Sequence, residues 1–188
     1  MTENKNEFNL SAEDRISNRL LENNVHFLTG EITDTTVEKA IKWIVYENSL
    51  GHNKNLTLHI NSFGGSIYDA FALIDVMRSS KCKVRTIGTG AIMSAAFLIF
   101  AAGAKGERYI GRNTSILCHQ FSEEVEGKYH DIKALMRENE LSNQRMVTLL
   151  TECTDLSPKF IKNKLLPATD VWLMPHEIVE LGIADHIL

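Results

Sequence analysis

The sequence predicts an α/β fold in which strands and helices alternate along one domain. Short apolar runs are separated by longer segments whose apolar residues recur at helical spacing. A chain of 188 residues with 44% hydrophobic side chains can bury one sizeable core. Strands that alternate with helices imply right-handed β-α-β crossovers. We expect residues 1–10 to form a flexible tail and residues 11–188 to form the domain, because no repeat, low-complexity segment or linker interrupts it.

In the N-terminal half, local signals mark where helices begin. Ser11 can cap one helix, and either Thr33 or Asp34 can cap the next. The expected elements are a helix over 12–22, a strand over 25–29, a helix after Thr33 or Asp34, a strand over 56–60, a helix over 67–78 and a strand over 83–88. Between the second strand and the third helix, the segment 61–65 is expected to be a turn.

The C-terminal half contains a long polar helix over about 127–152. Its apolar residues are Ile132, Leu135, Met136 and Leu141, and the helix cannot bury itself in its own domain. The other expected elements are a helix after Ser94, strands over 108–110 and 115–119, a helix over 158–165, a strand over 171–173, a helix over 175–181 and a terminal strand.

Composition and charge exclude several classes of function. The net charge is −4 and no block of Lys or Arg stands out, so we expect no nucleic-acid partner. Three widely spaced cysteines without a CxxC pair argue against a disulfide framework or a zinc site and for a reducing compartment. No cluster of His, Asp and Glu has metal-ligand spacing, and we expect no metal or other cofactor. The N-terminus lacks a signal peptide and the longest apolar run, 91–103, is too short for a bilayer, so we expect a cytoplasmic protein without a membrane partner.

Ser94 is the most informative residue. It lies in the otherwise apolar or small stretch 90–103, where a buried hydroxyl without a partner costs about 1–3 kcal/mol. A packed helix favours alanine there unless the oxygen has a function. A strand over 83–88, a tight turn at Gly88 and Gly90 and the following helix would hold the Ser94 oxygen beside free backbone N–H groups. This arrangement suits a nucleophile.

A serine nucleophile needs a base, and the base needs a group that fixes its tautomer. His119 ends an expected strand and could be the base, although such a histidine is more often a core-edge side chain. Asp170 precedes an apolar strand and could orient the base, although an isolated aspartate there is more often a turn or a cap. Cys118, beside His119, is expected to be a small buried hydrophobe and not a nucleophile.

A glycine-containing segment could supply the third component, an oxyanion hole. Asn61-Ser-Phe-Gly-Gly-Ser follows a strand and opens a helix, so its glycines can turn backbone N–H groups toward a developing negative charge. A helix-opening turn or a phosphate-binding loop are the alternatives. The segment lacks the GxxxxGK[ST] spacing of a nucleotide-binding loop.

With Ser94, His119 and Asp170 in this order along the sequence, the chain resembles the Clp protease proteolytic subunit (ClpP) family over residues 12–188. The matching segments are Phe27-Leu-Thr-Gly, Ile60-Asn-Ser-Phe-Gly-Gly, Gly90 through Ser94 to Ala101-Ala-Gly-Ala-Lys-Gly, Cys118-His-Gln and Val179-Glu-Leu-Gly-Ile-Ala-Asp-His-Ile-Leu. So many motifs in the right order make chance agreement negligible.

The resemblance implies a crotonase-like α/β subunit of repeated β-β-α units, with the long polar helix protruding as a handle. It implies Ser94 as nucleophile, His119 as general base and Asp170 as the residue that orients it. It also implies that the backbone N–H groups of Gly65 and Ala95 form the oxyanion hole. The implied activity is hydrolysis of peptide bonds by a serine endopeptidase.

The family's assembly is implied as well. Family members form homo-oligomers of two stacked heptameric rings, whose handles meet between the rings and whose active sites face an internal chamber. Unfolded polypeptides are the implied substrates. A separate AAA+ Clp ATPase would thread them into the chamber and would be the only component that uses ATP.

This chain departs from the family pattern around the site. Phe63 replaces the usual proline of the glycine loop, and proline would fix φ there. The usual proline and glycine after Gln120 give way to Phe121-Ser-Glu-Glu. The expected substrate-contacting residues are Phe63, Gly64, Gln120 and Phe121. The carboxylates of Glu123, Glu124 and Glu126 would disfavour acidic peptides.

Two further departures concern assembly. Thr169 stands where many family members carry an arginine that helps to link the two rings, which implies other contacts here. The N-terminal tail lacks the proline-containing sequence of the axial loops that touch the ATPase in the family.

Three other functions are compatible with parts of the sequence. A catalytically weak or inactive subunit could complete a mixed ring, but all three triad positions are filled. A crotonase-type acyl-CoA enzyme shares the subunit fold but needs no Ser-His-Asp set. Triad peptidases of the signal-peptide-degrading or capsid-maturation type lack the Cys-His-Gln segment and the long handle.

Overall fold

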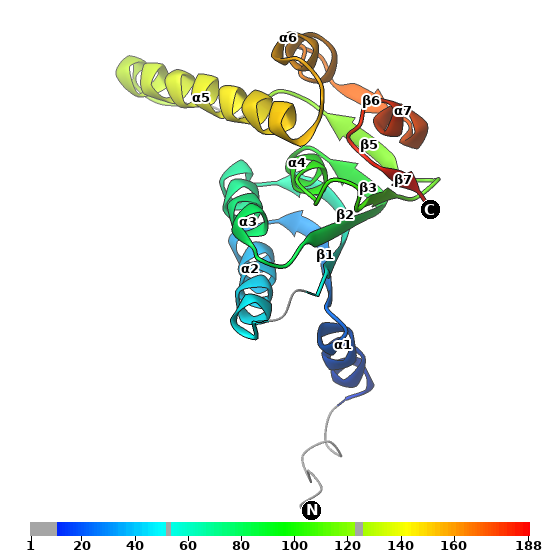
Figure 1. Ribbon diagram of the computed structural model, residues 1–188. Helices are drawn as coiled ribbons and strands as arrows, with labels where there is room; N and C mark the ends of the chain where they lie inside the picture. Colours follow the sequence, from blue (N-terminus) through cyan, green and yellow to red (C-terminus); the bar gives the residue numbers. More distant parts are fainter. Residues whose placement is uncertain (1–10, 52–53, 123–125) are drawn as a thin grey trace, which may run out of the picture.

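The computed structural model describes residues 11–51, 54–122 and 126–188, and within them the strands form one sheet (Figure 1). The strands are β1 (Val25–Ile32), β2 (Leu56–Gly65), β3 (Val84–Met93), β4 (Arg108–Ile110), β5 (Ser115–Cys118), β6 (Val171–Leu173) and β7 (His186–Ile187). The main path runs β1-β2-β3-β4-β7, while β5 branches from β3 and carries β6. All strand pairs are parallel except the antiparallel pair of β5 and β6.

Helices connect most of these strands. They are α1 (Ala12–Glu22), α2 (Asp34–Ser49), α3 (Ile67–Ser79), α4 (Ala95–Ala101), α5 (Tyr129–Cys153), α6 (Pro158–Phe160), the π-helical turn η2 (Ile161–Leu165) and α7 (Pro175–Glu180). Ser11 caps α1 by accepting from the Asp14 N–H at 3.0 Å, as its sequence predicts. Thr33, rather than Asp34, caps α2. Figure 1 shows α2 and α3 together on one side of the sheet, with α4 above the middle strands.

The first three strands are longer than the sequence predicts. The ladder between β1 and β2 shifts register between Thr29 and Glu31, and that between β2 and β3 shifts between Ile60 and Ser62. These irregularities let the chain stay in the sheet through the glycines, since an extra residue in a ladder is absorbed as a bulge. The segment 61–65 is therefore the end of β2 and not a turn.

The prediction of a tight turn at Gly88 and Gly90 is also wrong. Both glycines lie within β3, which continues to Met93 and delivers the chain directly to Ser94. Gly90 has φ +70°, and a Cβ on it would lie 2.7 Å from the Asn61 side-chain oxygen. That oxygen accepts the Ala91 N–H at 3.0 Å, so the glycine makes room for a side-chain bond between β2 and β3.

The core lies between the sheet and its helices, and α4 is its centre. Every residue of α4 is buried. Arg108 is also fully buried and pairs with Asp185, with 2.7 Å between nitrogen and oxygen. Burial favours the neutral form of Asp185, but the hydrogen bonds and the charge of Arg108 outweigh it, and the pKa of Asp185 is lowered.

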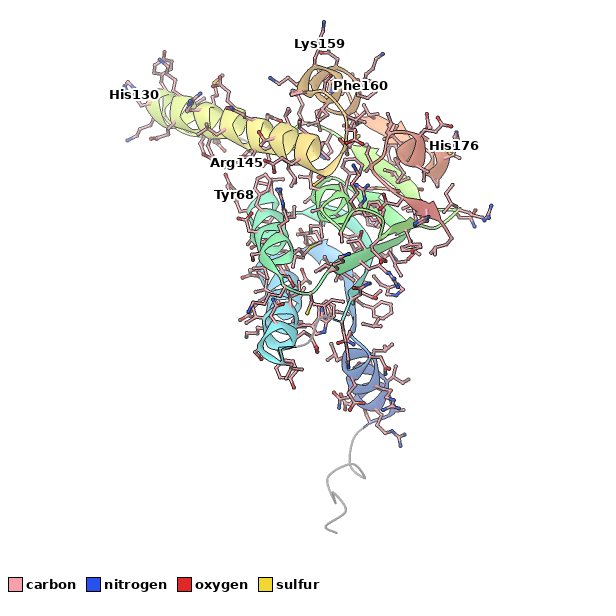
Figure 2. All side chains as sticks on the ribbon, in the orientation of Figure 1. Tyr68, His130, Arg145, Lys159, Phe160 and His176 are labelled. Carbon is pink, nitrogen blue, oxygen red and sulfur yellow. The ribbon has the colours of Figure 1, made fainter. Side chains whose placement is uncertain are left out.

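The long helix predicted over 127–152 is confirmed as α5, and it projects from the body of the molecule (Figure 1). Its buried residues, Ser142, Met146, Val147, Leu149 and Leu150, all lie in its C-terminal half. In Figure 2, His130 lies at the free end of α5, while Arg145 lies nearer the body, above Tyr68 of α3. Tyr129 and Met136 are exposed on the free half.

The predicted fold class is confirmed, since parallel strands alternate with helices in a mixed α/β fold. The helix expected over 158–165 is a short α-helix that continues as a π-helical turn. The expected tail over 1–10 lies outside the described residues. Among the described helices, none combines the length and the apolar character needed to cross a membrane.

Candidate active site

Ser94 lies at the junction of β3 and α4, in a backbone conformation that side chains rarely adopt. Its φ is +55° and its ψ is −124°, which costs on the order of 1–3 kcal/mol. The surroundings maintain this conformation, because the Ser94 N–H donates to the Leu117 carbonyl at 2.9 Å and buried α4 follows directly. The side chain makes no capping bond to α4. The Ser94 hydroxyl is therefore available for another partner.

That partner is His119. The Nε2 atom of His119 lies 2.8 Å from the Ser94 oxygen. The sheet sets this pairing, because β3 and β5 are parallel neighbours with Met93 opposite Leu117. Ser94 directly follows the last residue of β3, and His119 directly follows the last residue of β5. The structure thus brings together the two residues that the sequence assigns as nucleophile and base.

The other ring nitrogen of His119 defines the tautomer. Its Nδ1 atom lies 2.5 Å from the backbone carbonyl oxygen of Gln120. A carbonyl can only accept, so Nδ1 carries the proton and donates it. In the neutral ring Nε2 is then unprotonated and accepts the Ser94 hydroxyl. A general base that takes the proton of serine needs this tautomer.

Asp170 lies near this pair but is not bonded to it. The antiparallel ladder of β5 and β6 pairs Cys118 with Val171, so His119 and Asp170 are the next two opposing positions. Asp170 is exposed. Among the described residues, no hydrogen bond joins its carboxylate to the His119 ring, whose Nδ1 is bonded to Gln120 instead.

The glycines at the end of β2 lie next to Ser94 and the strand beside it. Gly64 has φ +102°, and a Cβ on it would lie 2.7 Å from the Ser94 Cβ and 3.2 Å from the Ala95 nitrogen. Gly65 has φ +148°, and a Cβ on it would lie 2.3 Å from the Ile32 carbonyl oxygen. Only glycine fits at either position. The glycine segment, the serine and the first amide of α4 therefore form one cluster.

Comparison with known proteins matches nearly the whole chain to one family. The family model described as Clp protease matches residues 9–188. The chain belongs to the Clp protease family.

Individual members of the Clp protease family are similar along nearly their whole length. The chain is 29% identical to ATP-dependent Clp protease proteolytic subunit 2 of Rhodococcus jostii (strain RHA1), over 95% of this chain and 91% of that protein. It is 30% identical to ATP-dependent Clp protease proteolytic subunit 1 of Prochlorococcus marinus (strain MIT 9312), over 92% of this chain and 88% of that protein. The expected family and enzyme class, a serine-type peptidase, are confirmed.

The residues that this Clp protease family member is expected to use for substrate lie around the Ser94 cluster. Phe63 is 77% exposed and precedes Gly64. Phe121 is half-buried, and its ring meets the edge of Tyr68 with 6.5 Å between ring centres. The Gln120 side-chain amide donates to the Leu166 carbonyl at 2.9 Å. Of the three glutamates expected to repel acidic peptides, Glu126 is exposed, while Glu123 and Glu124 lie outside the described residues.

Sequence reasoning missed one residue beside the site. Asn143 of α5 accepts the Phe121 N–H through its side-chain oxygen, at 2.9 Å. Its amide nitrogen donates to the Asn139 carbonyl at 3.0 Å. A polar side chain in the middle of a long polar helix carries no signal in the sequence, and only the packing of α5 on the 119–121 segment brings it here.

Cys118 is confirmed as a buried residue that is not activated. Its side chain is 1% exposed, and burial raises the pKa of its thiol to about 12. At neutral pH it is therefore protonated and a poor nucleophile. In the part of the chain that the structure describes, no group of His, Cys, Asp and Glu could hold a metal ion.

Proposed function

We propose that this peptidase hydrolyses unfolded polypeptides through a Ser94-His119-Asp170 triad. The observation that carries the proposal is the 2.8 Å contact between Ser94 Oγ and His119 Nε2, in the tautomer that accepts the serine proton. Membership of the Clp protease family supports the same reaction class.

The reaction proceeds through an acyl-enzyme. Ser94 attacks the peptide carbonyl carbon while its proton passes to His119 Nε2, and the carbonyl oxygen becomes an oxyanion. Collapse of this tetrahedral species breaks the C–N bond, and His119 delivers the proton to the leaving amine. His119 then takes a proton from a water molecule, which attacks the ester carbon on Ser94. Cleavage of the ester releases the carboxylic acid product, and His119 returns the proton to the Ser94 oxygen.

The backbone amides of Gly65 and Ala95 would stabilise the oxyanion. Ser66 N–H donates to the Ile32 carbonyl at 2.8 Å, and in a parallel ladder the residue opposite Ile32, which is Gly65, then directs its own N–H away from β1. That direction faces β3, which ends at Met93, the residue before Ser94. Ala95 is the first residue of α4, where N–H groups have no partner within the helix.

Asp170 would supply the charge that a carbonyl lacks. The Gln120 carbonyl orients the neutral His119 ring, but it cannot neutralise the imidazolium that forms during the reaction. Two observations support this role: Asp170 is the position opposite His119 if the register of β5 and β6 is continued by one residue, and its side chain is exposed. We therefore assign Asp170 the role of balancing the charge of His119.

We propose a cytoplasmic, ring-shaped homo-oligomer as the working form. The relatives are named as proteolytic subunits of an ATP-dependent protease, which supports an assembly of several subunits that depends on ATP. From the family resemblance we propose two stacked heptameric rings fed by an AAA+ Clp ATPase. The free half of α5 exposes Tyr129 and Met136 and would be covered where the rings meet. ATP would be used by the ATPase alone. An inactive ring subunit is the second candidate, but the joined Ser94 and His119 favour an active one.

Two assays on the same fractions test the proposal. Light scattering during size-exclusion chromatography gives the mass of the particle, and cleavage of a fluorogenic peptide gives its activity. We expect cleavage in fractions of an assembled ring particle. Ser94→Ala should abolish cleavage and leave the elution profile unchanged, and normal turnover by Ser94→Ala would refute the assignment.

A further inference from the structure

We propose that Asn143 of α5 is a positioning residue for His119, and that it acts through a single peptide group. This inference rests on the proposed function, because it concerns the base of the Ser94 reaction. It starts from two hydrogen bonds on opposite ends of the peptide group that links Gln120 to Phe121.

The carbonyl oxygen of this peptide group belongs to Gln120 and accepts the proton on His119 Nδ1. Its N–H belongs to Phe121 and donates to the Asn143 side-chain oxygen at 2.9 Å. The two ends of a trans peptide are held in one rigid plane and point in opposite directions. A bond that fixes the N–H end therefore also fixes the direction of the carbonyl that holds His119.

Asn143 is itself held in place. Its amide nitrogen donates to the Asn139 carbonyl at 3.0 Å, one turn earlier in α5. This second bond determines which end of the amide faces Phe121, because only the oxygen can accept an N–H. A continuous chain of hydrogen bonds thus runs from α5 through Asn143, the peptide group and His119 to Ser94. Bonds in such a chain polarise one another.

The peptide group has no support of this kind from β5. That strand ends at Cys118, so Gln120 and Phe121 lie beyond its ladder. The Gln120 side chain is bonded separately, to Leu166. Without Asn143, the peptide plane can rotate and the Nδ1 partner of His119 is no longer fixed. The free Nδ1 proton can then move to Nε2, which produces the tautomer that cannot take the serine proton.

Three variants of Asn143 separate this role from a purely structural one. Asn143→Leu keeps the approximate size but removes the acceptor. Asn143→Asp keeps an oxygen for the Phe121 N–H, loses the donor to Asn139 and adds a negative charge. In Asn143→Ser the side chain is too short to reach the Phe121 N–H, and this variant replaces Asn143→Leu in the test if the leucine variant does not fold. Gln144→Leu is the matched control, because Gln144 is the next residue of α5 and is exposed.

The readouts are kcat and KM for a fluorogenic peptide, the rate of covalent labelling by a fluorophosphonate, and the thermal transition. For Asn143→Leu and Asn143→Ser we expect kcat and the labelling rate to fall by about 10- to 100-fold together, with KM within about threefold, because a misplaced base slows chemistry more than binding. Asn143→Asp and Gln144→Leu should keep kcat, KM and the labelling rate within about threefold of the wild-type values, with the thermal transition of the wild type.

Wild-type kcat and labelling in the leucine and serine variants would overturn the inference. So would an equal loss in Asn143→Asp, since that variant retains the acceptor. The proposed function is judged separately, by wild-type cleavage and its loss in Ser94→Ala. If those results hold while Asn143→Leu is fully active, only the positioning role of Asn143 fails.

Discussion

The Nε2 atom of His119 lies 2.8 Å from the hydroxyl oxygen of Ser94, although 24 residues separate them along the chain. Neighbouring parallel strands create this contact, because β3 ends at Met93, which pairs with Leu117, and β5 ends one residue later at Cys118. Ser94 and His119, the proposed nucleophile and base, are therefore positioned by the sheet and not by a flexible loop. A site on such rigid elements holds its geometry before substrate arrives.

Asp170 should contribute less here than the third residue of a triad usually does. Removing that aspartate from other triad enzymes costs about 10⁴-fold in kcat. The Gln120 carbonyl already orients His119, so Asp170→Ala should lose only charge compensation and retain more activity, with a loss of about 10²- to 10³-fold. The measurement is kcat for a fluorogenic peptide.

Asp155→Ala is the matched control, because Asp155 is exposed and pairs with Lys105. It should leave kcat unchanged. A loss of about 10⁴-fold or more in Asp170→Ala would show that the carbonyl does not substitute for the carboxylate. Full activity would remove Asp170 from the mechanism.

Gly64→Ala should inactivate the protein more than it destabilises it. The added Cβ would lie 2.7 Å from the Ser94 Cβ and 2.9 Å from the Met93 carbonyl oxygen, so the nucleophile must shift. A displacement of about 1 Å can cost about 100-fold in rate. We expect kcat to fall by at least about that factor.

Gly182→Ala separates this crowding from backbone strain alone. Gly182 also has a positive φ, +67°, but a Cβ there would meet nothing within 4 Å. It should lower the free energy of unfolding by about 1 kcal/mol and leave kcat unchanged. Equal kinetic losses in the two variants would show that Gly64 does not act through contact with Ser94.

The ion pair between buried Arg108 and partly buried Asp185 should make stability depend on pH in the acid range. The folded-state pKa of Asp185 is lowered, so the stability that this carboxylate contributes is present above its unfolded pKa and is lost as the pH falls through the folded one. Asp185→Asn leaves the buried Arg108 without its counter-charge and should cost about 3 kcal/mol at pH 7. It should also flatten the loss of stability below about pH 4.

Denaturant unfolding between pH 7 and pH 3 measures both effects. Glu107→Gln is the control, because it also removes the carboxylate of an ion pair, but from a partner that water can reach. The side chain of Arg85 is 33% exposed, whereas that of Arg108 is 1% exposed. Glu107→Gln should cost no more than about 1 kcal/mol. If the free energy of unfolding of Asp185→Asn changed with pH as it does in the wild type, Asp185 would not be the source of the pH dependence.

Much of the site could be predicted from the sequence because its signals are local. Ser94 is a lone hydroxyl in an apolar stretch, and His119 ends an apolar strand. The sequence also indicates the glycine segment, but it predicts a turn where the structure has the end of β2. The register shifts in β1 and β2 could not be predicted, because they depend on how neighbouring strands pair and not on either strand alone.

The hydrogen bonds of His119 show more clearly what a sequence cannot predict. The family resemblance implies that Asp170 orients His119, whereas in the structure Nδ1 of His119 is bonded to the Gln120 carbonyl, and the next N–H, of Phe121, is bonded to Asn143. Backbone groups are the same at every position, so a sequence does not show which carbonyl faces which side chain. Asn143 reaches Phe121 only because α5 packs where it does. Contacts of this kind appear only in three dimensions.

The most direct test of the account is to locate the adduct that a fluorophosphonate leaves on the protein. Peptide mass spectrometry of the labelled protein should find the phosphonyl group on Ser94. His119→Ala, provided its thermal transition matches that of the wild type, should label much more slowly. An adduct on another residue, or equal labelling rates in the wild type and His119→Ala, would contradict the claim that His119 activates Ser94.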